Sequence, residues 1–260
     1  MSKRKSNLAP TNTQKGIAET KILASPFTEG IFYSTPFFKN YWVASIIILV
    51  LSFSLYHACL PFGYVLDDQM VITGNSFTKK GFSGIWDIMT TESFEGYFGE
   101  RKELVQGNRY RPLSIVTFAI EHGIVGDMNP WLSHFINIIL YGITGILLMM
   151  VLTMMFRNYK SSAWWMSIPF AAAIIFVAHP IHTEAVANIK GRDEIMSMLF
   201  SLAALYAGLR YSDAGEKKWL IVSLISFFLG LLSKENAITY LAVIPLTMYF
   251  FGHDNWKKMR

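Results

Sequence analysis

The sequence has one cysteine, few charged side chains and no short targeting segment at its start. Cys59 is the only cysteine and lies in an apolar stretch, so the chain offers neither a disulfide nor a thiolate metal site. Asp, Glu, Lys and Arg make up 16% of the residues, whereas soluble domains have about 25%. Hydrophobic residues make up 52%, and the mean hydropathy is +0.34. This composition indicates an integral membrane protein.

The net charge of +5 does not indicate a nucleic-acid partner, because the basic residues are spread over many segments. A nucleic-acid-binding surface gathers such residues on one face. The first forty residues are polar and basic, and they are too long for a cleavable signal peptide, in which an apolar core follows the basic start at once. We therefore predict a disordered cytoplasmic leader over 1–40 that ends at an uncleaved first helix.

Six apolar stretches are candidates for membrane-spanning helices, which need roughly 17–25 mainly apolar residues. They cover residues 41–61, 132–156, 164–178, 195–211, 218–232 and 237–252. The sequence therefore predicts an all-α polytopic membrane protein with about six transmembrane helices, in a membrane domain over 41–252. A short cytoplasmic end over 253–260 follows this domain.

Basic residues in the short hairpins indicate how these helices are oriented. The hairpins 157–163 and 210–218 both carry them, and with the N-terminus inside, 14 of the 23 Lys and Arg lie on the inner side. The long segment 62–131 then lies outside, and its alternating glycine and aromatic residues predict short helices on the membrane surface. We expect a cytoplasmic N-terminus and an active face on the periplasmic or lumenal side.

Three polar clusters begin where apolar stretches stop, and with this orientation all three reach the outer surface. The first cluster is the pair Asp67–Asp68, which follows the first span. An acid at this place is either a helix-end cap or a general base that takes a proton from an attacking hydroxyl, an effect worth roughly 10²–10⁴ in rate. One carboxylate of an adjacent pair would also be free to bind a metal.

Two arginines, Arg109 and Arg111, precede an apolar helical run that begins at Leu113. Guanidinium groups beside a helix start suit an anion such as phosphate. The alternative is that both side chains reach lipid headgroups at the interface.

The second cluster contains His179, His182 and Glu184. The three-residue spacing would put both histidines on one face of a continuous helix, but Pro180 between them favours a break or a turn. One interpretation is a divalent metal site, with Asp67, Asp68 or Glu184 as a further ligand. The other is that the histidines form hydrogen bonds to the structure or to a substrate phosphate.

Arg192 opens the fourth span, where a cation opposes the helix dipole, so we expect it to serve an anionic group. Lys234 and Glu235 form the third cluster, between the last two spans, and could pair with each other or with the other clusters. Ionisable residues at membrane depth are functional candidates by default.

Together these motifs resemble the transmembrane O-mannosyltransferase family with tetratricopeptide repeats, often called TMTC, within the GT-C glycosyltransferase superfamily. The resemblance rests on the segments 64–68 (YVLDD), 108–114 (NRYRPLS), 179–186 (HPIHTEAV), 191–194 (GRDE) and 233–235 (SKE), in matching order over about residues 40–252. Members of the family carry further transmembrane helices and a long repeat domain. This chain is therefore expected to be truncated before them, with an incomplete membrane domain.

The resemblance implies transfer of a mannose-like sugar from a polyprenyl-phosphate donor to Ser or Thr hydroxyls of an acceptor protein, on the non-cytoplasmic face of a lipid membrane. Asp67 or Asp68 would be catalytic. The resemblance implies that the residues around the donor phosphate are Arg109, Arg111, His179, His182, Arg192 and Lys234, with Glu184 and Glu235 in support. No cofactor is expected other than a divalent metal, which the sequence leaves open.

The alternative to an enzyme is a catalytically inactive membrane scaffold or anchor that keeps the fold. A transporter is less favoured, because transporters place polar groups near the bilayer midplane and these clusters crowd one interface. The uncleaved basic leader suits a bacterial inner membrane, and an internal eukaryotic membrane is the other option.

Overall fold

The computed structural model of the protein describes residues 36–100, 109–158 and 164–252. The described residues from Asn40 onward belong to one compact unit. Helices are the only regular secondary structure in the described ranges, which confirms the all-α class. The predicted leader over 1–40 lies almost wholly outside the described residues, as does the predicted cytoplasmic end over 253–260.

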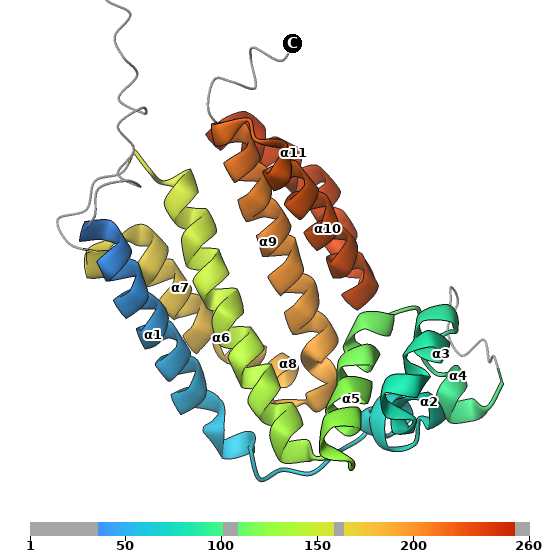
Figure 1. Ribbon diagram of the computed structural model, residues 1–260. Coiled ribbons are helices and arrows are strands. Elements are labelled where there is room, and N and C mark those ends of the chain that lie inside the picture. Colours follow the sequence, from blue (N-terminus) through green and yellow to red (C-terminus); the bar gives the residue numbers. More distant parts are fainter. Residues whose placement is uncertain (1–35, 101–108, 159–163, 253–260) are drawn as a thin grey trace, which may run out of the picture. The chain divides into compact units, whose positions relative to one another are not determined.

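Each of the six predicted spans contains a helix (Figure 1). These helices are α1 Pro36–Tyr56, α6 Pro130–Met155, α7 Ile168–Ala178, α9 Arg192–Ala214, α10 Lys217–Ser233 and α11 Tyr240–Phe251. Within the described ranges, three stretches are long and apolar enough to cross a membrane: Tyr41–Cys59, Pro130–Met155 and Ile189–Ala214. A fourth arises if α7 and the segment Pro180–Ala187, which meet at a bend of 49°, form one broken span. The remaining two, α10 and α11, are shorter, with 17 and 12 residues.

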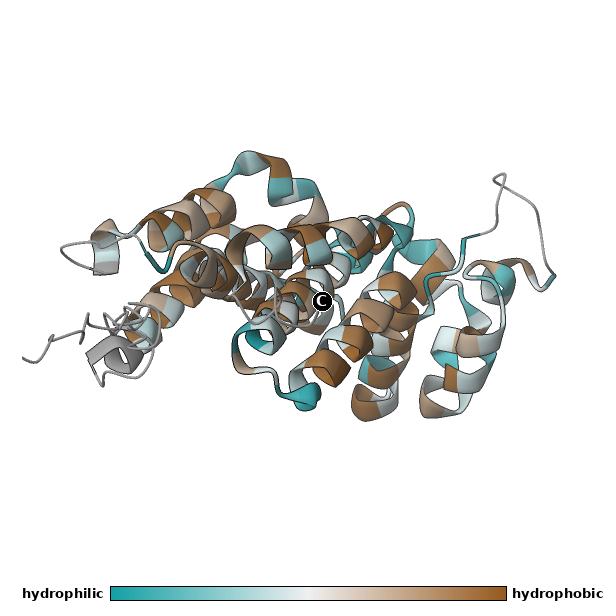
Figure 2. Ribbon diagram, turned by 90° about the horizontal axis from the view of Figure 1, so that it is seen from above, coloured by the Kyte–Doolittle hydropathy of each residue, from teal (hydrophilic) through white to brown (hydrophobic). Residues whose placement is uncertain are grey.

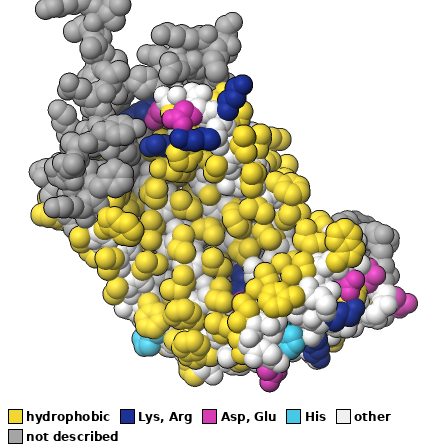
Figure 3. Space-filling view, in the orientation of Figure 1, with side chains coloured by type: hydrophobic (Ala, Val, Ile, Leu, Met, Phe, Trp, Pro, Cys, Tyr) yellow, Lys and Arg dark blue, Asp and Glu magenta, His cyan; other side chains and the backbone are white. Residues whose placement is uncertain are grey.

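The outer surface of these helices is apolar. Ile221, Leu224 and Phe228 of α10 are all more than half exposed. Hydrophobic side chains cover most of the face seen in Figure 3 between charged groups near its two ends, and apolar residues occupy most of the long helices in Figure 2. Water would disfavour such a surface, whereas lipid does not. The described part of the chain is therefore that of an integral membrane protein.

The interior is built around two contacts of the long helices. In the first, Ile48 of α1, Ile138 of α6 and Val177 of α7 are fully buried against one another. In the second, α9 packs against α10 through small residues, and the Ser223 hydroxyl donates to the Ala204 carbonyl at 2.8 Å. Small side chains allow two helices to approach closely, which is how helices commonly associate in membranes.

A layer of short helices lies between α1 and α6 in the sequence. It comprises η2 Gln69–Thr73, α2 Ser76–Lys79, η3 Gly81–Gly84, α3 Ile85–Thr90, α4 Glu95–Phe98 and α5 Pro112–Val125. This layer has its own apolar core, in which Ile72, Phe94 and Phe118 are buried. The short helices predicted for 62–131 are therefore present, and α5 begins next to Leu113 as the apolar run predicts.

Candidate functional site

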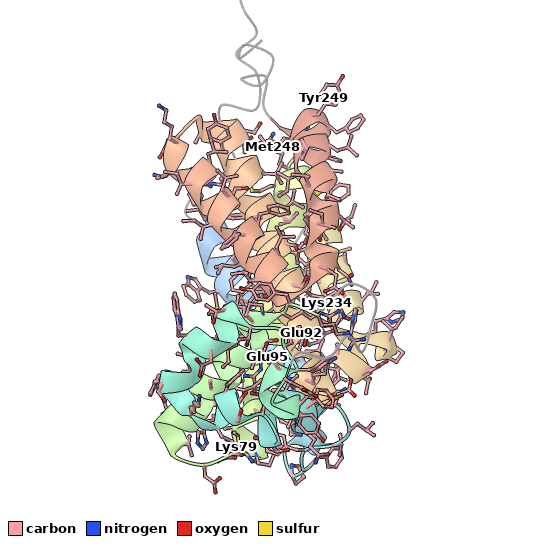
Figure 4. The ribbon with its side chains drawn as sticks, turned by 90° about the vertical axis from the view of Figure 1, so that its right-hand side faces the viewer. Lys79, Glu92, Glu95, Lys234, Met248 and Tyr249 are labelled. Atoms are coloured by element: carbon pink, nitrogen blue, oxygen red, sulfur yellow. The ribbon has the colours of Figure 1, made fainter. Side chains whose placement is uncertain are left out.

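The charged motifs meet at one end of the long helices, beside the layer of short helices. Figure 4 shows Lys234 at the junction between the long helices and the layer that carries Glu92 and Glu95, with Met248 and Tyr249 at the far end of α11. The far end has charges of its own, because Arg157 donates to Asp213 at 2.7 Å. Hydrogen bonds across the junction join motifs that are up to 124 residues apart in sequence.

Asp68 connects two of these motifs and is completely buried. Its carboxylate accepts the Val65 N–H at 2.9 Å and the Lys190 N–H at 2.8 Å. The first bond closes the turn from Val65 to Asp68. The second connects this turn to η6 Ile189–Gly191, which directly precedes α9. Burial raises the pKa of Asp68, and the two amide hydrogen bonds offset only part of this effect. Asp68 is therefore placed to hold the backbone.

Asp67 has the opposite environment. Its side chain is 47% exposed, and Oδ2 lies 3.6 Å from Lys190 Nζ. The preceding residue, Leu66, is the only described residue other than glycine with a positive φ, 47°, and its side chain is exposed. A left-handed backbone is costly for leucine, and such strain is often found at functional sites. Of the two adjacent acids, Asp67 is the one that an incoming substrate can reach.

Arg111 is the centre of the ion pairs at this junction. It precedes α5 and is mostly buried, and its Nη1 donates to Asp193 Oδ2 at 2.9 Å. Its Nε donates to Glu235 Oε2 at 2.8 Å, and Nη2 donates to the other oxygen of Glu235. This two-pronged pairing, with the contact to Arg111 as its main cause, lowers the pKa of Glu235. Burial alone would lower the pKa of Arg111, but the two acids raise it above its ordinary value.

A small cleft opens beside Arg111. It is lined by Arg109, Arg111, Lys190 and Asp193, together with apolar and hydroxyl side chains. Arg109 lies over the ring of Phe94, with the guanidinium carbon 5.7 Å from the ring centre. Three cations, together with the carboxylate of Asp193, thus border one cleft. Guanidinium and ammonium groups gathered in one place favour an anionic group such as phosphate.

Lys234 and Glu235 each form an ion pair with a residue of another motif. Lys234 donates a hydrogen bond to Glu194 in the first turn of α9, while Glu235 accepts hydrogen bonds from Arg111. The connection between α10 and α11, which consists of Lys234 and the turn η7 Glu235–Thr239, is therefore bound to the start of α9 and to the residue before α5. This outcome is one of the two that the sequence left open.

Arg192 lies inside the protein, away from the cleft. Its side chain is fully buried, and it donates to Asn137 Oδ1 at 2.7 Å and to the Ser133 carbonyl at 2.9 Å. The same guanidinium pairs with Glu121 and stacks on Phe118, at 4.1 Å from the ring centre. The expectation that Arg192 serves an anion is met by Glu121 of α5, and in this structure a donor phosphate would have no access to it.

The two histidines lie on the break between α7 and α8 Thr183–Ala187, as Pro180 predicts. His179 is exposed, and its Nδ1 accepts the Ile181 N–H at 3.2 Å. His182 packs on Phe176, with ring centres 4.4 Å apart. Glu184 is exposed on α8. Within the described ranges, neither histidine has a hydrogen bond or ion pair to the cluster around Arg111.

A metal site was one interpretation of the histidines and acids. Among the residues that the structure describes, no group of three or more His, Cys, Asp or Glu side chains is arranged to hold a metal ion. Cys59 is a free, buried thiol in the described part.

Four charged residues of the junction were not singled out as site residues by the sequence: Glu121, Lys190, Asp193 and Glu194. Asp193 and Glu194 look like ordinary first-turn acids, which satisfy the dipole of α9. The one signal that could have found Glu121 is its charge at the end of an apolar run, since such a charge needs a partner. Nothing in the sequence distinguishes Lys190 from other loop lysines.

The chain is 29% identical over 224 residues to human "Protein O-mannosyl-transferase TMTC2". The matched region covers 81% of this chain and 24% of that protein. It is 32% identical over 209 residues to the Drosophila melanogaster protein O-mannosyl-transferase Tmtc2, with 75% of this chain and 20% of that protein covered. It is 32% identical over 204 residues to human TMTC1, with 72% and 22% covered.

No family model and no solved structure matches the chain. The chain spans about a quarter or less of the length of these curated relatives. The similarity extends over most of the chain, and it confirms the resemblance that the motifs indicate. By sequence, the protein is therefore a relative of the TMTC family of protein O-mannosyl-transferases.

Proposed function

We propose that this chain forms membrane-embedded catalytic machinery of a glycosyltransferase. The transferred group is a mannose-like sugar, the donor is a polyprenyl-phosphate sugar, and the acceptor is a Ser or Thr hydroxyl of a protein. The observation that carries the proposal is the exposed carboxylate of Asp67 at the same junction as a cleft bordered by three cations. The names of the relatives, protein O-mannosyl-transferases, support the reaction class.

In this reaction the acceptor oxygen attacks the anomeric carbon of the donor sugar. The bond from that carbon to the phosphate oxygen breaks, and its electron pair leaves with polyprenyl phosphate. The acceptor proton passes to a carboxylate, for which we assign Asp67 because its side chain is the exposed one. Asp68 is assigned as a positioning residue, since both of its oxygens accept backbone N–H groups.

The leaving phosphate needs charge stabilisation more than a proton, so cations suit it better than a second acid. Arg109 and Arg111 border the cleft and are assigned to the phosphate. Glu235 and Asp193 hold the Arg111 guanidinium in one orientation before the donor arrives. Lys234, on the turn next to the cleft, is assigned to the outer part of the same anion site.

The remaining predicted residues receive other roles in this proposal. Arg192 is a positioning residue that ties α5, α6 and α9 together from within. His179, His182 and Glu184, on the turn between α7 and α8, are assigned to the edge of the site, where a long donor or an acceptor peptide would pass.

The proposed topology has six spans, with the N-terminus in the cytoplasm and the layer of short helices on the non-cytoplasmic surface. It is supported by the apolar outer faces of the two shorter helices α10 and α11, where Ile225 and Leu246 are exposed. The apolar tail of the donor would lie between helices and lipid, with its phosphate at the cleft. The relatives cited above come from animals, so the comparisons lend no support to a bacterial membrane.

A specific observation also favours the alternative of an inactive scaffold. Arg111, Lys190 and Lys234 each have an acidic partner in the described structure, so the cluster has a structural role without any substrate. A scaffold would keep these pairs and consume no sugar donor.

A transfer assay separates the two. The protein, expressed from its complete gene, is reconstituted in lipid vesicles with radiolabelled polyprenyl-phosphate mannose or glucose and an acceptor protein pool. Label moving to protein, and failing to move in Asp67→Asn, supports the enzyme. Monodisperse, folded protein that transfers label from neither donor would contradict the proposal and favour the scaffold.

A further inference from the structure

Lys190 lies between two acids that belong to different parts of the junction. Its Nζ is 3.6 Å from Asp67 Oδ2 and 3.9 Å from Asp193 Oδ2. Its backbone is fixed independently, because its N–H donates to Asp68 Oδ1 at 2.8 Å and to Asn188 Oδ1 at 3.2 Å. The side chain can therefore change partner while the turn that carries it stays in place.

The same side chain borders the small cleft with Arg109 and Arg111. Neither acid is close enough to Nζ for a short hydrogen bond, since charge-assisted N–H···O bonds are about 2.7–2.9 Å long. Asp193 is also engaged by Arg111 at 2.9 Å, so its hold on Lys190 is shared. The cleft itself has room for about one water molecule, so a phosphate would lie at its mouth. There its oxygens would approach Lys190 more closely than either carboxylate does.

We propose that Lys190 is a shared cation that passes from Asp67 to the phosphate of a polyprenyl-phosphate ligand. Without this ligand Lys190 neutralises Asp67. With the phosphate at the mouth of the cleft, Asp67 loses its counter-ion and becomes available to the acceptor hydroxyl. The role of Asp67 as base rests on the function proposed above. The choice of polyprenyl phosphate as the ligand rests on it as well, whereas the exchange of partners by Lys190 is tested by phosphate binding alone.

A lysine that exchanges partners differs in one measurable way from a lysine that only binds phosphate. Asp67 and the phosphate compete for one ammonium group, so removing the charge of Asp67 tightens phosphate binding, and it does so through Lys190. If Asp67 only repels the phosphate across space, the same tightening is seen with or without the Lys190 ammonium. A double-variant cycle distinguishes these two situations.

The experiment measures binding of polyprenyl phosphate, with the unphosphorylated polyprenol as the control for the lipid tail. The proteins, in nanodiscs, are the parent, Lys190→Met, Asp67→Asn and the double variant. Lys190→Met should weaken binding of the phosphate about tenfold or more, as expected for a hydrogen bond between charged groups, and leave polyprenol binding unchanged. Asp67→Asn should tighten phosphate binding by about twofold or more, and this gain should vanish in the double variant.

Two matched variants complete the set. Lys190→Arg should restore most of the phosphate affinity, and Lys79→Met, which removes an exposed lysine at the end of α2, should not change it. Loss of thermal stability in Lys190→Met, with no rescue by arginine, would overturn the proposal, as would an equal gain from Asp67→Asn in both backgrounds. The measurement needs neither sugar nor acceptor, so absence of transfer activity would refute the proposed function and leave this result to stand by itself.

Discussion

The Asp68 carboxylate accepts the backbone N–H of Lys190 at 2.8 Å and so joins two turns that are 122 residues apart in sequence. Because its other oxygen accepts the Val65 N–H, the side chain has no oxygen that is free of a backbone donor. Its neighbour Asp67 is exposed and touches only the flexible end of Lys190 among the described ion pairs. Two adjacent acids thus have different tasks, one within the fold and one at the surface.

Asp68→Asn is expected to lower the stability of the folded protein. The amide keeps one acceptor oxygen but turns its NH₂ group toward a backbone N–H, so a buried donor loses its partner at a cost of about 3 kcal/mol. Thermal unfolding in detergent micelles measures this loss. Unchanged stability would mean that Asp68 does not connect the two turns.

Leu66 allows a test of backbone strain beside the proposed base. Asn adopts a positive φ more readily than Leu, and a β-branched residue does so least readily. Leu66→Asn should therefore leave stability unchanged or raise it, and Leu66→Val should lower it by about 1 kcal/mol. Val65→Leu, at the preceding exposed position, serves as the control in the same unfolding assay. Equal stability of the Asn and Val variants would contradict the left-handed turn.

The buried pair of Arg192 and Glu121 should be sensitive to loss of either partner. Glu121→Gln leaves a fully buried guanidinium without its counter-charge, which costs about 3–5 kcal/mol. Replacing both residues, as Arg192→Met with Glu121→Leu, should recover much of this loss, because apolar side chains need no counter-ion. The yield of monodisperse protein and its unfolding temperature report both effects. A double variant that is less stable than Glu121→Gln would show that the hydrogen bonds to Asn137 and Ser133 matter more than the charge pair.

Glu235 gives the junction a dependence on acid pH. Its pKa is lowered from 4.5, mainly by Arg111, so the folded state holds the carboxylate in its charged form. The stabilisation is complete above the ordinary pKa and is lost as the pH falls below it, through the lower folded pKa. The stability difference between the parent and Glu235→Gln should be constant near neutral pH and shrink below about pH 4.5. Unfolding temperatures measured at several pH values test this, and a difference that grows in acid would contradict it.

The sequence predicted the helices well, because each long apolar run of this chain has one solution in a membrane: a helix that satisfies its own backbone. Pro180 ended α7 where its missing N–H requires, and α5 began directly after Arg111. The convergence of the charged motifs could also be expected, since each one follows or precedes an apolar run at the same end.

The pairing of individual side chains could not be predicted. Asp67 and Asp68 are adjacent in sequence, yet after the left-handed turn at Leu66 the first is exposed and the second is buried. Arg192 has the motif position of a ligand-binding residue, yet its partner Glu121 lies 71 residues earlier in the chain. Such long-range partners depend on how the short helices fold back against α9, for which apolar periodicity gives no signal.

We propose that Asp67 acts on the substrate and that Asp68 acts on the fold. The most direct test compares Asp67→Asn and Asp68→Asn in vesicles, with the initial rate of sugar transfer and the unfolding temperature measured on the same preparations. Asp67→Asn should retain the unfolding temperature of the parent and lose transfer by roughly 10²-fold or more, whereas Asp68→Asn should lower the unfolding temperature. Full transfer by a stable Asp67→Asn protein would contradict this assignment.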